Sequence, residues 1–139
     1  MARCSRPESK LRTEVTQHEQ KEMERRMMKK VYICAPLGGN VSENLELVKT
    51  YTEYALKCGT APVVPHFYAL CLDDGIEKER EIGMAAGLSL LWFCDEMWIF
   101  GDEVTEGMQA EIRFCQNLNI KMKKIRYHEI NKKIGGKRI

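Results

Sequence analysis

The pattern of apolar and polar positions predicts short strands and helices that alternate along the chain. Runs of consecutive apolar residues such as "VYICAP" are typical of strands buried on both faces, and apolar positions three or four residues apart are typical of amphipathic helices. Strand-like and helix-like stretches alternate along the chain. They predict strands at 31–36, 61–66, 96–100 and 120–127, and helices at 16–30, 42–58, 80–93 and 106–118.

Several residues mark where these elements begin and end. Thr16 and Glu19 form a possible capping box for the first helix, which has few apolar residues and is expected to be solvated or docked on a partner. Ser42 is the predicted N-cap of the second helix, and Gly59 ends it. Residues 67–79 are expected to form a long loop with a helical turn.

This order of elements predicts an α/β fold with an open parallel sheet of four to five strands and helices on both faces, a flavodoxin- or Rossmann-like three-layer arrangement. The fourth strand alternates apolar and polar residues, so we place it at an edge of the sheet. Ligands of such sheets bind beyond the carboxyl ends of the strands. Here those ends lie at 35–40, 65–66 and 101–105, and we expect them to converge on one crevice.

The composition narrows the class of protein. A chain of 139 residues with 44% hydrophobic and 30% charged residues has the make-up of one soluble domain. No apolar run approaches the length of a membrane span, and the N-terminus is charged rather than apolar, so we expect a cytoplasmic protein with no membrane partner. The six cysteines form no CxxC pair and the three histidines do not cluster, which favours free thiols and predicts neither a metal site nor a cofactor.

Charge is distributed unevenly along the chain. Residues 1–30 hold nine basic and five acidic side chains, and 131–139 hold four basic ones, whereas 31–130 hold nine basic and fifteen acidic, a balance of −6. The predicted organisation is therefore a charged, partly helical N-terminal extension over 1–30, a domain over 31–130 and a basic C-terminal tail over 131–139. The acidic domain argues against nucleic-acid binding, although salt-sensitive contacts by the tails remain an alternative.

A carboxylate lies where the last predicted helix should be apolar. In "VTEGMQAEI", Glu111 shares a helical face with Met108, Ile112 and Cys115. A carboxylate among apolar side chains is costly unless it is paired or used in chemistry. Glu111 is thus a candidate catalytic residue, and a hydrogen bond from the Tyr32 hydroxyl is a candidate means of holding it in place; plain core packing of Tyr32 is the alternative.

Residues at the strand ends are candidates for binding a ligand. The glycines of "APLGGN" would let the backbone approach a ligand, and the helix that follows would offer free amides to an anion; a plain turn is the alternative. Thr105 is an expected N-cap whose hydroxyl would also suit a phosphate. His66 follows Pro65 at a strand end and is expected to line the crevice. Asp95, next to a strand start, is expected to be structural.

The segments "VYICAPLGG" and "TEGMQAEI", in this order, resemble the nucleoside 2-deoxyribosyltransferase-like family, which includes deoxynucleoside 5′-monophosphate N-glycosidases and uncharacterised bacterial and phage relatives. The resemblance spans about 31–126. It implies a reaction at the N-glycosidic bond of a deoxyribonucleoside or its 5′-monophosphate, with Glu111 as the nucleophile and Tyr32 orienting it. It also implies a homodimer or larger oligomer. The candidate substrate-binding residues are Pro36, Leu37, Gly38, Gly39, Asn40, His66, Thr105, Gly107 and Met108.

One position departs from the family pattern. The family has an Asp eight residues before the Asp of the third strand, where it orients the base and helps to protonate it; counting back from Asp95 gives Gly87. A leaving base needs a proton or an equivalent stabiliser, and Asp73, Asp74 and His66 are the candidate substitutes. The sequence therefore supports two hypotheses, an N-glycosidase or deoxyribosyltransferase and a nucleotide-binding module without turnover. A nucleic-acid accessory protein acting through its tails ranks third.

Overall fold

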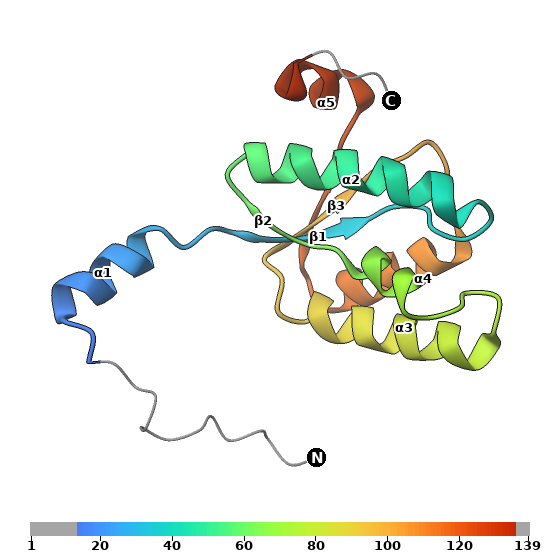
Figure 1. Cartoon of the computed structure of the whole chain (residues 1–139), viewed down its shortest axis with the longest axis horizontal. Helices are drawn as coiled ribbons and strands as arrows, with labels where there is room; N and C mark the ends of the chain where they lie inside the picture. Colours follow the sequence, from blue (N-terminus) through green and yellow to red (C-terminus); the bar gives the residue numbers. More distant parts are fainter. Residues whose placement is uncertain (1–13, 136–139) are drawn as a thin grey trace.

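The computed structural model describes residues 14–135, in which helices and strands alternate as the sequence predicts (Figure 1). The predicted strands and helices are all present, and one further helix follows them. The elements are α1 (Gln17–Arg25), β1 (Lys30–Cys34), α2 (Val41–Lys57), β2 (Ala61–Val63), the 3₁₀ helix η1 (Pro65–Leu70), α3 (Glu77–Leu91), β3 (Glu96–Ile99), α4 (Glu106–Asn117), β4 (Lys121–Lys124) and α5 (Tyr127–Ile134).

The strands form one parallel sheet in the order β2-β1-β3-β4. Figure 1 shows α2 and α5 on one face of the sheet and α3 and α4 on the other. This arrangement confirms the predicted three-layer α/β fold, and β4 lies at an edge as its alternating pattern indicated. The carboxyl ends of β1, β2 and β3 lie at the same edge, because all three strands are parallel.

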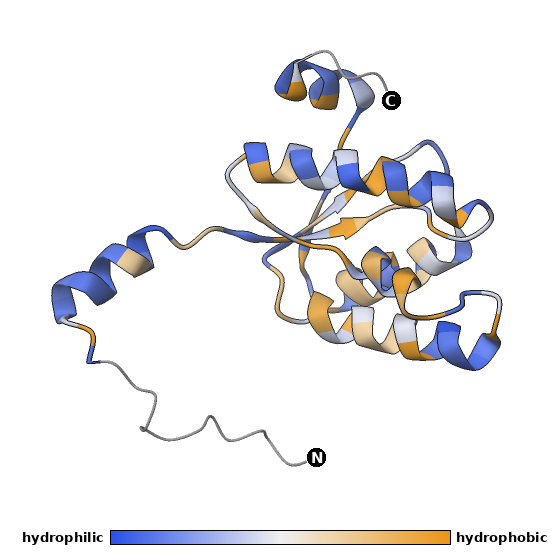
Figure 2. Cartoon of the chain, viewed as in Figure 1, coloured by the Kyte–Doolittle hydropathy of each residue, from blue (hydrophilic) through white to orange (hydrophobic). Residues whose placement is uncertain are grey.

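The alternation of side chains along β1 divides the core into two clusters. Val31 and Ile33 pack with the side chains of α2 and α5, whereas Tyr32 and Cys34 pack on the opposite face with α3 and α4. Figure 2 shows apolar residues at the centre of the domain and hydrophilic ones along most of α1. The strand period therefore directs Tyr32 to the same face of the sheet as Glu111.

Two predicted boundaries are wrong. Asn40, rather than Ser42, caps α2, because its side-chain oxygen accepts a hydrogen bond from the Glu43 amide at 3.2 Å and the helix already begins at Val41. The predicted loop over 67–79 contains the expected helical turn, since η1 extends to Leu70, but α3 begins at Glu77 rather than at residue 80. Proline at the start of η1 and acidic residues in the first turn of α3 favour these two starts.

The sequence analysis missed α5. The segment predicted as a strand to residue 127 ends at Lys124, and α5 extends past residue 130 into the predicted tail. Ile130 and Ile134 are buried against α2, and Gly135 ends the helix with a φ of 71°. The spacing of these two isoleucines and the glycine after them was the available signal.

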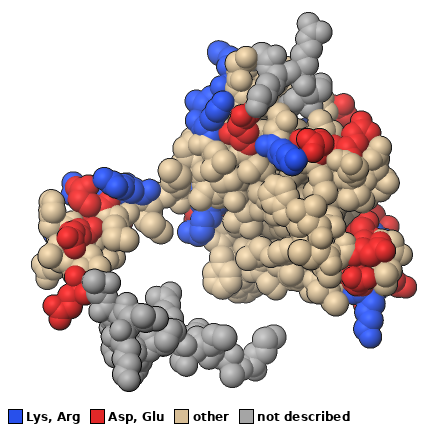
Figure 3. Space-filling view, viewed as in Figure 1, with Lys and Arg blue, Asp and Glu red and all other residues tan. Residues whose placement is uncertain are grey.

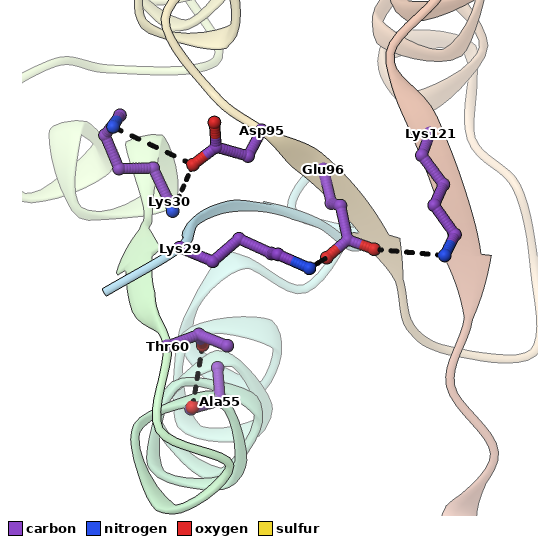
Figure 4. A network of polar contacts seen from close by, with 7 residues as sticks. All are labelled: Lys29, Lys30, Ala55, Thr60, Asp95, Glu96 and Lys121. Atoms are coloured by element: carbon purple, nitrogen blue, oxygen red, sulfur yellow. Dashed lines mark hydrogen bonds and ion pairs between the residues drawn. The ribbon is translucent and has the colours of Figure 1, made fainter. Parts of the chain in front are cut away.

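A polar network joins the amino ends of the central strands, at the edge of the sheet opposite the carboxyl ends (Figure 4). An oxygen of Asp95 accepts a hydrogen bond from the Lys30 amide at 2.8 Å. The buried Glu96 carboxylate lies 3.0 Å from the Lys29 ammonium and 3.8 Å from that of Lys121. Asp95 is therefore structural, as expected, because it ties β1 to β3.

The N-terminal helix stands apart from the domain. The capping box of Thr16 and Glu19 is present, and none of the side chains of α1 is buried. None of the helices within residues 14–135 is long and apolar enough to cross a membrane. Parts of the predicted extension and tail, together with Cys4, lie outside the described residues. The cysteines that the structure describes are free thiols, namely Cys34, Cys58, Cys71, Cys94 and Cys115.

Candidate functional site

A cavity opens at the carboxyl ends of β1 and β2, between η1, α3 and the start of α4. Three stretches that are far apart in sequence meet there, as the predicted crevice required. Of the candidate residues, Tyr32, Leu37, Gly38, His66, Thr105, Gly107, Met108 and Glu111 line it. The other lining residues are Ala35, Pro65, Tyr68, Ala69, Leu72, Asp74, Glu79, Arg80, Gly83, Met84, Gly87 and Glu106.

Glu111 and Tyr32 form a buried pair at the floor of the site. Glu111 is 9% exposed, and the Tyr32 hydroxyl donates a hydrogen bond to its carboxylate. Burial raises the pKa of Glu111 to about 7, and the hydrogen bond from Tyr32 opposes this rise. Burial and the neighbouring carboxylate raise the pKa of Tyr32, which therefore stays protonated as a donor. A carboxylate of this kind is poorly solvated and held in one orientation, and both properties suit a nucleophile.

Gly87 makes room for this pair. It is a buried residue of α3, and a Cβ added there would lie 2.9 Å from the Tyr32 hydroxyl and 3.4 Å from Pro65 Cβ. The first distance is shorter than van der Waals contact. The carboxylate that the family resemblance implied at this position therefore has no room while Tyr32 keeps its place.

His66 is buried in the wall of the cavity. Its Nε2 lies 2.8 Å from the Ala35 carbonyl oxygen, and because a carbonyl only accepts, Nε2 carries the hydrogen. Burial lowers the pKa of His66, so the ring is neutral near pH 7. Nδ1 is then a hydrogen-bond acceptor, and it has no partner among the described residues. His66 lines the cavity and is 5% exposed.

The predicted glycine loop is only partly at the cavity. Leu37 and Gly38 line it, and Asn44 holds their carbonyl oxygens with bonds of 3.0 and 3.2 Å from its side-chain amide. Among the other candidates of this loop, Pro36 borders a separate hollow beside α2, and Gly39 and Asn40 are exposed and do not line the cavity.

The start of α4 contributes a hydroxyl and backbone amides. Thr105 is the N-cap, as expected, and its hydroxyl oxygen accepts a hydrogen bond from the Met108 amide at 3.3 Å. Gly107 and the buried Met108 complete this wall of the cavity, and the Glu106 side chain lies beside them.

Sequence reasoning singled out Gly87 on α3 but missed the other residues of this helix that line the cavity. Arg80, Met84 and Gly87 recur at helical spacing and face the cavity, and Arg80 is the only Lys or Arg that lines it within residues 14–135. The predicted helix over 80–93 already contained these three positions, but their spacing alone does not distinguish a cavity wall from an exposed face. Asp74 lines the cavity and Asp73 does not. Within the part of the chain that the structure describes, no three His, Cys, Asp or Glu side chains are grouped to hold a metal ion.

Comparison with solved structures places the fold among known enzymes. The structure is similar to that of a 2-deoxyribosyltransferase from the psychrotolerant bacterium Bacillus psychrosaccharolyticus, with a TM-score of 0.55 and 18% sequence identity. The match covers 75% of this chain and 81% of that one. At this identity the likeness shows a shared fold and nothing finer.

Comparison of the sequence gives the family. No curated protein matches the chain. A family model described as a domain of unknown function (DUF7768) matches residues 29–125. Because this match spans most of the chain, including the cavity and both members of the Glu111–Tyr32 pair, the protein belongs to the DUF7768 family.

Proposed function

We propose that this protein cleaves, or transfers a group at, the N-glycosidic bond of a deoxyribonucleoside or its 5′-monophosphate, with Glu111 as the nucleophile. The observation that carries the proposal is the buried carboxylate at the cavity floor, oriented by the Tyr32 hydroxyl. The fold shared with a 2-deoxyribosyltransferase supports the same reaction class, as does the resemblance of the two segments that contain this pair.

The proposed reaction has two steps. In the first, a Glu111 carboxylate oxygen bonds to the anomeric carbon while the carbon–nitrogen bond breaks, and the base leaves with the bonding electrons and gains a proton. In the second, water or another base attacks the same carbon and releases the carboxylate. Tyr32 holds the carboxylate in the attacking orientation and keeps its pKa lower than burial alone would make it.

The proton for the leaving base needs a source other than position 87. His66 is neutral, and its hydrogen is engaged by the Ala35 carbonyl. Asp73 does not line the cavity, which leaves Asp74 among the residues considered from the sequence. Gly87 thus favours the second candidate function, a module on the same scaffold that binds a nucleotide or nucleoside without turnover.

Release of free base tests the two functions. The protein is incubated with deoxynucleosides and their 5′-monophosphates, and free base is followed by chromatography. We expect release by the wild type and its loss in Glu111→Gln, with Glu81→Gln as the control because Glu81 is exposed on α3 and does not line the cavity. A second base added to the mixture distinguishes transfer from hydrolysis. Saturable binding without release would favour the binding module, and release by Glu111→Gln would refute the mechanism.

We further propose that the protein is a homodimer or larger oligomer. At the end of α3, Trp92 and Phe93 are 60% and 71% exposed, which is unusual for side chains of this size and supports contact with a second copy. Light scattering after size-exclusion chromatography measures the mass directly. A single species with the mass of one chain would contradict the proposal.

A further inference from the structure

We propose that this cavity selects an uncharged nucleoside over its 5′-monophosphate, and that Asp74 is the side chain that excludes the phosphate. The inference rests on the proposed function. It names the substrate class from the charges and hydrogen-bonding groups of this chain.

The charged side chains around the cavity are mostly acidic. Asp74, Glu79, Glu106 and Glu111 line it, against the single cation Arg80. The described residues form no ion pair between Arg80 and any of these carboxylates. Figure 3 shows acidic side chains gathered over the start of α3, with few basic ones beside them. A phosphate dianion entering this site would meet net negative charge.

Asp74 lies where the glycine loop would otherwise receive an anion. One of its carboxylate oxygens is 3.4 Å from the place that a Cβ on Gly38 would occupy. The carboxylate therefore rests against the backbone that the sequence had singled out for phosphate. An anion bound against the Gly38 backbone would therefore lie beside this carboxylate and would be repelled by it.

The two helix starts near the cavity are already capped. At α2, Asn40 accepts a hydrogen bond from the Glu43 amide, and its own amide donates to the Glu43 carboxylate at 2.9 Å. At α4, the Thr105 hydroxyl accepts from the Met108 amide. One amide of each helix start is thus bonded within the protein, and Asn40 at the start of α2 does not line the cavity.

The Asp74 carboxylate also discriminates by hydrogen bonding, because it only accepts hydrogen bonds. A nucleoside and its monophosphate share the same base and differ at the 5′ position. The 5′-hydroxyl of a nucleoside can donate a hydrogen bond to Asp74, whereas an ionised 5′-phosphate has only acceptor oxygens.

The test compares each deoxynucleoside with its own 5′-monophosphate in the wild type, Asp74→Asn and Asp73→Asn. The wild type is expected to favour the nucleoside by at least about tenfold in kcat/KM. Asp74→Asn should reduce that preference by about tenfold. Loss of a proton donor at this position would lower kcat for both substrates alike, so the ratio of their kcat/KM values isolates the effect of the charge. Added salt should reduce it in the wild type, because screening weakens the repulsion. Asp73→Asn removes the same charge one residue away, outside the cavity, and should leave the preference unchanged.

Three outcomes would overturn the inference: a wild-type preference for the monophosphate, an unchanged preference in Asp74→Asn, or a selective loss of monophosphate use in Arg80→Ala. If no base is released at all, the same pairs of ligands are compared by calorimetric Kd on the wild-type protein. Tighter binding of the nucleoside would then support the selection by charge while the catalytic proposal fails. Equal binding would refute the selection, and no binding of either ligand would refute both proposals.

Discussion

Replacing Glu111 by Gln is expected to stabilise the fold at alkaline pH and to leave its stability nearly unchanged at acidic pH. Burial raises the pKa of this carboxyl from 4.5 to about 7, so the folded protein holds the proton more tightly than the unfolded chain does. The stabilising contribution of protonated Glu111 is complete below pH 4.5 and is lost as the pH rises through about 7. Glutamine has a similar shape, does not ionise, and still offers an oxygen to the Tyr32 hydroxyl.

The magnitude follows from the two pKa values. The difference between 4.5 and about 7, at roughly 1.4 kcal/mol per pKa unit, corresponds to about 3 kcal/mol. Because Glu111 is only 9% exposed, solvent screening reduces this figure little. The variant should therefore exceed the wild type in free energy of unfolding by up to about 3 kcal/mol above neutral pH.

Urea denaturation followed by tryptophan fluorescence measures the effect at about pH 5 and about pH 8.5. Trp98 is buried beside β1 and reports on the core. Glu81→Gln is the matched control, because it removes an exposed carboxylate from α3 and should show no such dependence on pH. If Glu111→Gln is no more stable than the wild type at the higher pH, Glu111 is ionised in the fold without penalty, and the assigned burial cost is wrong.

Three further variants test the site and the core. Tyr32→Phe removes the hydrogen bond that lowers the pKa of Glu111, so the acidic limb of the pH–kcat profile should move above about 7. The value of kcat should fall about 10- to 100-fold. An acidic limb at the wild-type pH would contradict an orienting role for Tyr32. Gly87→Ala should destabilise the fold by about 1–3 kcal/mol, because its Cβ would lie 2.9 Å from the Tyr32 hydroxyl. Gly83→Ala, whose Cβ would make an ordinary contact of 3.4 Å, should be neutral or stabilising. Equal melting temperatures of these two variants would refute the steric argument. Ile130→Ala should cost about 2–4 kcal/mol in urea unfolding, since it is 1% exposed, and a loss below 1 kcal/mol would show that α5 is not part of the core.

Most of the fold could be predicted from the sequence, because the signals that define it are local. Runs of apolar residues marked the strands, helical spacing marked α2 and α4, and the order of elements implied a parallel three-layer fold. The clearest failure, α5, came from extending the strand pattern through Tyr127, since Ile125, Arg126 and Tyr127 continue the alternation of β4 up to the first residue of the helix. The early start of α3 was missed because its first turn is polar and resembles a loop.

Some residues of the candidate site could likewise be recognised from the sequence, and others could not. Glu111 stood out because a carboxylate in an apolar helical stripe is visible in the sequence itself. The orienting role of Tyr32 was implied by the resemblance of its segment to the nucleoside 2-deoxyribosyltransferase-like family, with core packing as the alternative. Arg80 did not stand out, and Asp74 could not be separated from Asp73 as a candidate proton source, since a charged side chain near a loop has no local mark that separates a cavity wall from an exposed surface. Pro36, Gly39 and Asn40 were expected at the cavity from their position after β1, yet none of them lines it.

The sequence by itself determined the α/β class and the presence of Glu111 on the inner face of α4, because periodicity is a property of neighbouring residues. Only the tertiary structure decided what surrounds that carboxylate. The Tyr32 hydroxyl, the bare backbone of Gly87 and the carboxylate of Asp74 come from three separate segments, and their distances depend on how a strand, a helix and a loop pack together. Such packing is set by the whole core rather than by any one stretch of sequence, so the glycine at position 87 could be noticed in the sequence but explained only in the fold.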